Sequence, residues 1–288
     1  MNPWIIATRP WSLVASAAPV VVATALAAAD GVIHWPSVPL LLLCAALIQI
    51  ASNLINDLED AKRGADAKRV GPLRAVSSGL LTARSVRNVA AGVVITAFVL
   101  GQPLVFRAGW EILLIGVVCL VAAWAYTGGP YPLAYHALGD AAAFIFFGVL
   151  AVIGTYYVHA TTWSMDSLVL SLGPGLLAAN ILNVNNIRDI PTDAEAGKRT
   201  LAVVLGDERA RWMYTIFAVA AIIIPCALLA QQRGPWLWLP AILLPIAGVL
   251  SYMVHTRRGR DLERALRGTA LFYLVYMIVM STALILAC

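Results

Sequence analysis

The feature that most constrains this sequence is a series of long apolar stretches separated by short segments that hold most of the charges. A helix needs about 20 mostly apolar residues to cross the hydrocarbon core of a bilayer. We therefore expect an all-α membrane protein with about nine transmembrane helices. The predicted spans are residues 11–29, 38–57, 86–104, 109–127, 138–158, 167–187, 212–230, 236–254 and 269–287.

The composition agrees with a lipid bilayer as the solvent. Of the 288 residues, 61% are hydrophobic and only 12% are charged, whereas soluble domains carry about 25% charged residues. The four cysteines stand singly inside apolar stretches, a spacing that predicts neither a metal knuckle nor a redox pair. The net charge of +5 is explained by membrane topology, so we expect no nucleic-acid partner.

The positions of the positive charges predict the orientation. With nine spans, 18 of the 20 lysine and arginine residues fall on the side that holds the N-terminus, and only Arg107 and Arg233 fall on the other side. Short cytoplasmic loops carry such an excess of basic residues. We therefore expect a cytoplasmic N-terminus and an outside C-terminus in the inner (cytoplasmic) membrane of the cell.

Two runs of asparagine and aspartate end the second and sixth spans, one run in each half of the chain. The first run contains Asn53, Asn56, Asp57 and Asp60, followed by Asp66, and the second contains Asn186, Asp189 and Asp193. Spacings of three, four and seven residues place side chains on one helix face. The chain thus reads as a single domain, 1–288, with two equivalent halves, roughly 1–135 and 136–288.

These two polar faces indicate a metal-diphosphate site. Carboxylates at membrane depth are costly and usually functional, and Mg²⁺ binds through a few carboxylates together with substrate phosphates. Arg74 follows the first cluster, and Lys198 and Arg199 follow the second, where they can neutralise phosphate oxygens. The other basic residues on this side, such as the run at 257–267, are typical of solvated loops.

An uncharged loop on the same side carries three tyrosines, Tyr126, Tyr131 and Tyr135. Their rings could face a cation or stack on an aromatic substrate, and an interfacial aromatic belt is the alternative. Asp140 begins the fifth span, where it either points into the same pocket or stabilises the N-terminus of the helix. With Asn53 and Asn186, these residues are candidates for an acceptor pocket.

On these motifs the chain resembles the UbiA superfamily of intramembrane prenyltransferases, over nearly its whole length. One family motif is matched by Asn56, Asp57, Asp60 and Asp66, and the other by Asp189, Asp193, Gly197, Arg199 and Thr200. Many members place an aspartate four residues after Asp60, where this chain has Gly64, so Asp66 matches the pattern less well.

Within the superfamily the chain looks most like the 1,4-dihydroxy-2-naphthoate polyprenyltransferases of menaquinone synthesis. The segments that carry this likeness are 71–76, 126–130, 138–140, 146–148, 185–189 and 197–202. The resemblance implies a UbiA-type bundle and prenyl transfer to the aromatic acid with loss of its carboxylate, giving demethylmenaquinone. Two Mg²⁺ ions and a polyprenyl diphosphate are the expected cofactor and donor.

The resemblance also implies roles for individual residues. Asp60, Asp189, Asp193 and Tyr126 are the expected catalytic residues, and Asn56, Asp57 and Asp66 join the three aspartates as metal ligands. The active site should face the cytoplasm, with the isoprenoid tail leaving sideways into lipid. Two alternatives stay open: the same chemistry on another acceptor (4-hydroxybenzoate, homogentisate or haem), and a secondary transporter.

Overall fold

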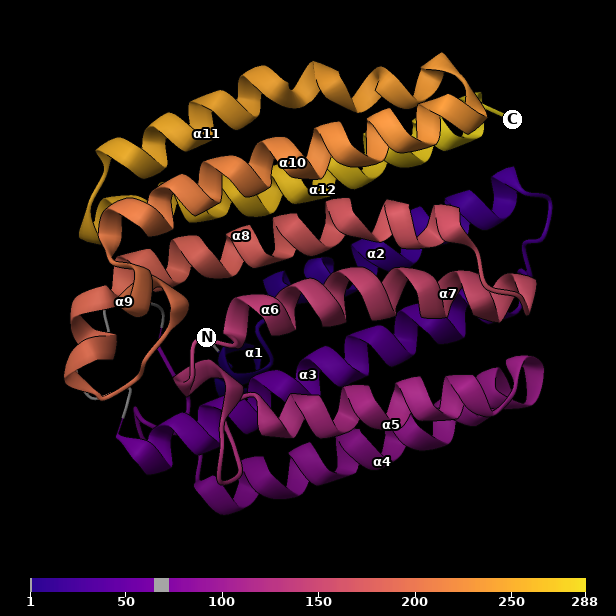
Figure 1. Cartoon of the computed structure of the whole chain (residues 1–288). Coiled ribbons are helices and arrows are strands. Elements are labelled where there is room, and N and C mark those ends of the chain that lie inside the picture. The colour runs from indigo at the N-terminus through magenta and orange to yellow at the C-terminus, as the bar shows by residue number, and fades with distance from the viewer. Residues whose placement is uncertain (1, 65–72) are drawn as a thin grey trace.

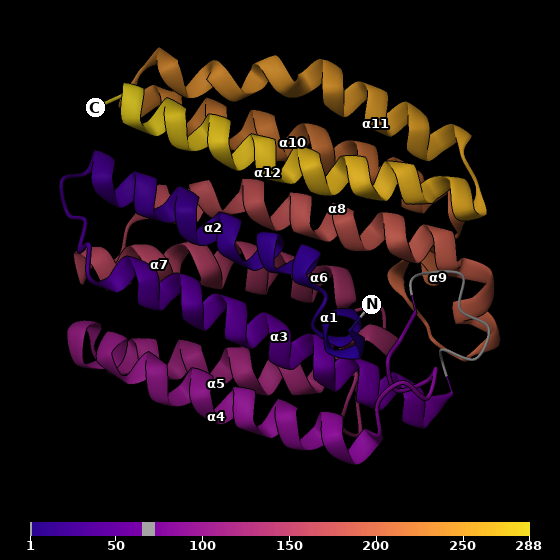
Figure 2. The ribbon, with the colours of Figure 1, turned by 180° about the vertical axis from the view of Figure 1, so that it is seen from behind.

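The computed structural model describes residues 2–64 and 73–288, and these residues form helices and connecting loops without a β-strand. The helices are α1 (Pro3–Thr8), α2 (Pro10–Ala29), α3 (Ser37–Arg63), α4 (Ala83–Ala108), α5 (Trp110–Ala125), α6 (Gly139–Phe144), α7 (Ala151–Ala160), α8 (Met165–Glu195), α9 (Leu201–Leu205), α10 (Asp207–Arg233), α11 (Leu244–Thr256) and α12 (Leu262–Leu286). Short 3₁₀ or π turns are η1 (Leu133–Tyr135), η2 (Ile145–Leu150), η3 (Pro235–Leu243) and η4 (Gly259–Asp261). The long helices run side by side in one bundle (Figure 1, Figure 2).

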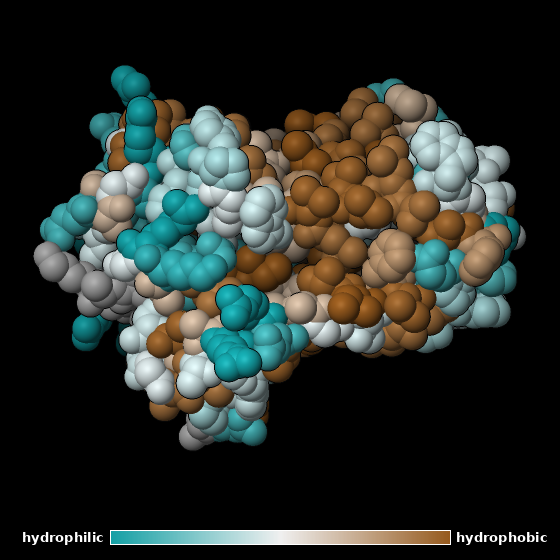
Figure 3. All heavy atoms as spheres, turned by 90° about the horizontal axis from the view of Figure 1, so that it is seen from below, coloured by the Kyte–Doolittle hydropathy of each residue, from teal (hydrophilic) through white to brown (hydrophobic). Residues whose placement is uncertain are grey.

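The all-α membrane fold expected from the sequence is confirmed. Within the described residues, eight helices are long and apolar enough to cross a bilayer. The expected span at 109–127 corresponds to α5, which has only 16 residues and is shorter than the others. Figure 3 shows a broad apolar band on one face of the bundle, with hydrophilic side chains gathered at its two ends.

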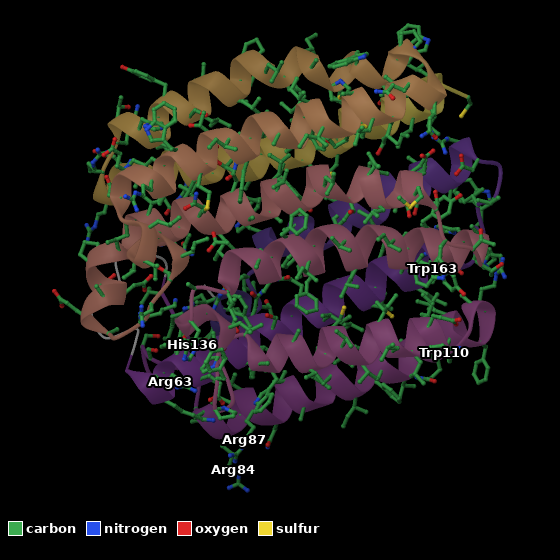
Figure 4. The ribbon with its side chains drawn as sticks, in the orientation of Figure 1. Arg63, Arg84, Arg87, Trp110, His136 and Trp163 are labelled. Atoms are coloured by element: carbon green, nitrogen blue, oxygen red, sulfur yellow. The ribbon has the colours of Figure 1, made fainter. Side chains whose placement is uncertain are left out.

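The two ends of the bundle differ in their side chains. Trp110 and Trp163 lie at one end, whereas Arg63 and His136 lie together at the other end, near α9 (Figure 4). Amphipathic indole rings favour the headgroup zone, and the separation matches the predicted division between sparsely and densely basic sides. Which end faces the cytoplasm stays a prediction.

The helices pack through one large and two small clusters. The large cluster joins α2, α8, α10 and α12, with buried aromatic side chains at Tyr214, Tyr273 and Tyr276. The small clusters join α3 to α1 and α4, and the far end of α4 to α5 and α7. Helices α3 to α5 therefore contact the rest of the bundle less extensively, and this leaves room for a cavity between the two groups.

Ion pairs and a hydrogen bond join the helices at the tryptophan-rich end of the bundle. Arg233, the last residue of α10, donates to Asp30 at 2.7 Å and to Asp166 at 2.6 Å. Tyr156 also donates to Asp30, at 2.6 Å. Residues of α7, α8 and α10 and the residue after α2 are thus joined at the end opposite the aspartate clusters.

Candidate active site

A large cavity of about 1580 Å³ lies inside the bundle. Its walls come from α1 to α9 and from α12, while α10 and α11 contribute none of the lining residues. Most of the acidic lining residues lie at the C-terminal ends of α3 and α8. Apolar residues such as Phe98, Ile115 and Phe147 line most of the remaining length, with a few uncharged polar residues among them. The cavity thus combines a polar end with a long apolar channel.

Asp60 is the acidic residue that α3 places at the polar end of the cavity. It is 3% exposed, accepts a hydrogen bond from the Tyr135 hydroxyl at 2.9 Å and lies 3.5 Å from the Arg74 guanidinium. One turn earlier, Asn56 accepts a hydrogen bond from the Thr127 hydroxyl at 2.8 Å. The side-chain oxygens of Asn56 and Asp60 are therefore held in place by the loops that follow α3 and α5.

The rest of the first polar run has a different role, which corrects the expectation of one shared face. One Asp57 oxygen accepts from the backbone N–H groups of Ala75 and Val76, at 3.0 and 3.4 Å. The Asn53 amide donates to the Thr8 carbonyl and the Ser12 hydroxyl. Neither residue lines the cavity. Asp57 instead holds the segment that carries Arg74, and Asn53 holds the junction of α1 and α2.

Asp189 lies at the matching position on α8, and its charge is already paired. The Arg188 guanidinium donates to both carboxylate oxygens of Asp189, at 2.8 and 2.7 Å. Its remaining nitrogen donates to Glu263 on α12 at 2.8 Å. A bidentate fork of this kind fixes both position and orientation of the carboxylate. Asp193 lies one helical turn after Asp189 on α8, and its carboxylate is 3.8 Å from the ammonium of Lys198.

The tyrosine loop covers the polar end of the cavity. Arg63 and Lys198 lie over the Tyr135 ring, 5.2 and 5.7 Å from its centroid. Tyr126 lines the cavity itself, and its electrostatic neighbours are the carboxylates Asp60, Asp140 and Asp193. Tyrosine side chains from one loop thus contact groups on both α3 and the segment after α8.

The loops after α5 and α8 also join through their backbones. The Ala137 N–H donates to the Arg199 carbonyl at 2.7 Å, and the Arg199 N–H donates to the Tyr135 carbonyl at 3.3 Å. This pairing places Lys198 at the cavity while the Arg199 side chain is exposed. Of the three basic residues expected to contact a diphosphate, Arg74 and Lys198 line the cavity, whereas Arg199 does not.

Most of the candidate residues meet at one place. The cavity is lined by Asn56, Asp60, Arg74, Tyr126, Asp140, Asn186, Asp189, Asp193 and Lys198. The described candidates that do not line it are Asn53, Asp57, Tyr131, Tyr135 and Arg199. Tyr131 is 59% exposed and stacks on His136, which makes it a surface residue rather than part of an acceptor pocket. Asp66 lies outside the described residues.

The donor groups at the polar end suit a metal that binds together with a phosphate ligand. In residues 2–64 and 73–288, no three histidine, cysteine or acidic side chains form a ready-made metal site. Mg²⁺ does not need such a cage, since one or two carboxylates usually hold it while water and substrate phosphates complete the shell. A carboxylate offers about four lone-pair sites, so Asp60 and Asp189 keep capacity beyond their present partners. The residues therefore fit Mg²⁺ bound to a diphosphate.

Sequence reasoning missed three residues of the site. Arg188 was counted only as a topological charge, yet it holds Asp189 in place. Glu263 lies in a stretch assigned to a solvated loop, but it lines the cavity and pairs with Arg188. Thr127 supports Asn56. Thr127 and Arg188 had a usable signal, because both lie in segments that carry the family resemblance (126–130 and 185–189), whereas Glu263 had none.

The fold and this site together define an intramembrane prenyltransferase, and the comparisons agree. The UbiA prenyltransferase family matches residues 16–284 of the chain, and the chain belongs to that family. Solved structures share the fold: a UbiA homologue from Archaeoglobus fulgidus bound to DMAPP and Mg²⁺ aligns over 96% of this chain and 99% of its own, with 17% identity and a TM-score of 0.67.

The curated relatives share one activity name within this family. The 1,4-dihydroxy-2-naphthoate octaprenyltransferase of Mycobacterium tuberculosis is 38% identical, over 98% of this chain and 96% of its own length. The enzyme of the same name from Escherichia coli is 34% identical over 96% of this chain and 94% of its own. The resemblance inferred from the motifs is therefore confirmed.

Proposed function

We propose that this enzyme transfers a polyprenyl group from a polyprenyl diphosphate to 1,4-dihydroxy-2-naphthoate. The observation that carries the proposal is the pairing of Asp60 and Asp189, on two helices, at the polar end of a cavity whose remainder is apolar. A diphosphate suits the polar end and an isoprenoid chain suits the apolar channel. The names of the relatives and the DMAPP and GPP bound with Mg²⁺ in the Archaeoglobus fulgidus homologue support the same reading.

The polar end of the cavity holds the diphosphate in this proposal. When bound, Mg²⁺ supplies positive charge next to the phosphate oxygens, and Asn56, Asp60, Asp189 and Asp193 are the residues that hold it. Arg74 and Lys198 neutralise the negative charge that grows on the leaving diphosphate as its bond to C1 of the prenyl chain breaks. Two ions and a cytoplasmic location of this end are part of the proposal.

The aromatic acceptor completes the reaction. The ring attacks C1, a new C–C bond forms, and the ring carboxylate leaves as CO₂, which gives a prenylated naphthoquinol that air oxidises to demethylmenaquinone. Tyr126 offers its ring face to the allylic cation from the cavity wall. The apolar walls exclude water, which would otherwise capture the same cation.

The role given to Lys198 leads to a kinetic prediction. Lys198→Ala should raise the KM for the prenyl diphosphate about tenfold or more, because a charged hydrogen-bond donor to phosphate is lost. The KM for the aromatic acid should stay within about twofold. Arg199→Ala is the matched control, because Arg199 is next to Lys198 in the chain but its side chain is exposed and does not line the cavity. An unchanged donor KM in the Lys198 variant would count against this contact.

Product analysis tests the proposed function directly. The purified full chain is incubated with a polyprenyl diphosphate, Mg²⁺ and a panel of aromatic acids, and the lipid products are identified by mass spectrometry. Demethylmenaquinone formed from 1,4-dihydroxy-2-naphthoate, and lost on addition of EDTA, is the expected result. Transfer only to 4-hydroxybenzoate or homogentisate would overturn the acceptor, and uptake of a solute into vesicles without Mg²⁺ and without transfer would favour a transporter.

A further inference from the structure

Asp140 is a buried carboxylate that the diphosphate site does not use. It lies in the first turn of α6, is 3% exposed and lines the cavity. Neither of its oxygens has a hydrogen-bond partner of good geometry among the described residues. Its polar neighbours are its own backbone N–H and the Asn186 amide on α8. A buried carboxylate without firm partners costs free energy, so folding alone does not explain this residue.

The surroundings of Asp140 set it apart from the other acids of the cavity. Asp60 has Tyr135 and Arg74, Asp189 has Arg188, and Asp193 has Lys198. The side chains found near Asp140, Asn186 and Tyr126, are by contrast uncharged. Tyr126 lies nearby, because a Cβ built on Gly139 would come within 3.2 Å of its hydroxyl. Asp140 is therefore suited to a neutral hydrogen-bond donor rather than to a phosphate.

The proposed acceptor offers such a donor in only one place. In 1,4-dihydroxy-2-naphthoate the 1-hydroxyl stands beside the 2-carboxylate and donates to it within the molecule. The 4-hydroxyl, on the far side of the ring, has no internal partner and needs one from the protein.

We propose that Asp140 binds the 4-hydroxyl of the aromatic acceptor, with Asn186 as the second polar group of this subsite. The inference rests on the proposed function and deepens it by assigning the residue that selects a dihydroxylated ring. Asp140 touches the acceptor and not the diphosphate, so its loss should leave donor binding intact. Tyr126, on the same side of the cavity, remains free to face the prenyl cation.

A binding cycle tests the assignment without relying on turnover. The purified full chain, with Mg²⁺ and geranyl thiolodiphosphate as an unreactive donor, is titrated with 1,4-dihydroxy-2-naphthoate or with 1-hydroxy-2-naphthoate, which lacks the 4-hydroxyl. The wild type should bind the dihydroxy ligand about 10- to 100-fold more tightly, the usual effect of one hydrogen bond to a charged group. Asp140→Ala should bind both ligands within about threefold of each other.

A second variant and a control separate this role from a structural one. Asp140→Asn keeps the shape of the side chain, should reduce the preference, and should not lower the thermal unfolding temperature, because the buried charge it removes has no firm partner. Asp166→Ala is the control: it breaks the contact with Arg233 at the other end of the bundle, so it should lower that temperature and keep the ligand preference.

The outcomes are distinct for the two proposals. A full preference for the dihydroxy ligand in the Asp140 variants, or no preference in the wild type, would overturn the subsite. A fall in unfolding temperature in Asp140→Asn with its ligand preference unchanged would give Asp140 a purely structural role. If the wild type prenylates neither naphthoate, the proposed function itself fails. Transfer to the dihydroxy acid by the wild type, with the preference lost in Asp140→Ala, would support both.

Discussion

Asp60→Asn and Asp189→Asn are each expected to lower kcat/KM for prenyl transfer by about 10³-fold or more. Each change keeps the shape of the side chain and removes a negative charge from the polar end of the cavity, where the proposed Mg²⁺-diphosphate binds. The two residues lie on different helices, α3 and α8, and we expect neither to replace the other. Initial rates over a range of Mg²⁺ and donor concentrations, together with direct donor binding, provide the measurement.

Glu59→Gln is the matched control for this experiment. Glu59 precedes Asp60 on α3, does not line the cavity, and pairs with Lys62 one turn further along the helix. Its loss should change kcat/KM by less than about threefold, because its carboxylate does not line the cavity in which the reaction takes place. Transfer at the wild-type rate in either Asp60→Asn or Asp189→Asn would remove the central observation behind the proposed function.

The sequence was sufficient for the architecture because lipid imposes simple rules. A spanning helix needs a minimum apolar length and keeps its backbone hydrogen bonds internal, so the positions of the helices follow from hydropathy. The aspartates of the two clusters could be assigned to helix ends in the same way. The short α5 is the exception: its apolar stretch was extended through Tyr126 and Thr127, which belong to the loop that supports Asn56.

Hydropathy and helical spacing could not predict the contacts between different elements. Helical spacing placed Asn53, Asn56, Asp57 and Asp60 on one face, and it could not show that loop backbone N–H groups would draw Asp57 away from the cavity. The link from Arg188 to Glu263 joins residues 75 positions apart, which periodicity within one helix does not detect. Such pairs depend on the packing of α8 against α12, which only the three-dimensional structure reveals.

The second large effect concerns the crossing of η2 and α8, where two glycines let the backbones touch. A Cβ built on Gly148 would lie 2.5 Å from the Gly175 Cα and 2.7 Å from the Ser171 carbonyl oxygen. These obstacles are backbone atoms, which cannot turn aside as the end of a side chain can. The neighbouring Phe147 lines the cavity, so separation of the two helices would also widen the apolar channel.

Gly148→Leu should therefore destabilise the fold by about 3 kcal/mol or more, at the upper end of the cost of overpacking. Gly148→Ala should have the same effect to a smaller degree. The measurement is thermal unfolding of the detergent-solubilised protein, followed by the loss of its size-exclusion peak. Gly92→Ala on α4 is the control, because a Cβ there meets nothing within 4 Å and alanine favours a helix. Equal unfolding temperatures for Gly148→Leu and the wild type would mean that the helices cross less closely than the backbone positions indicate.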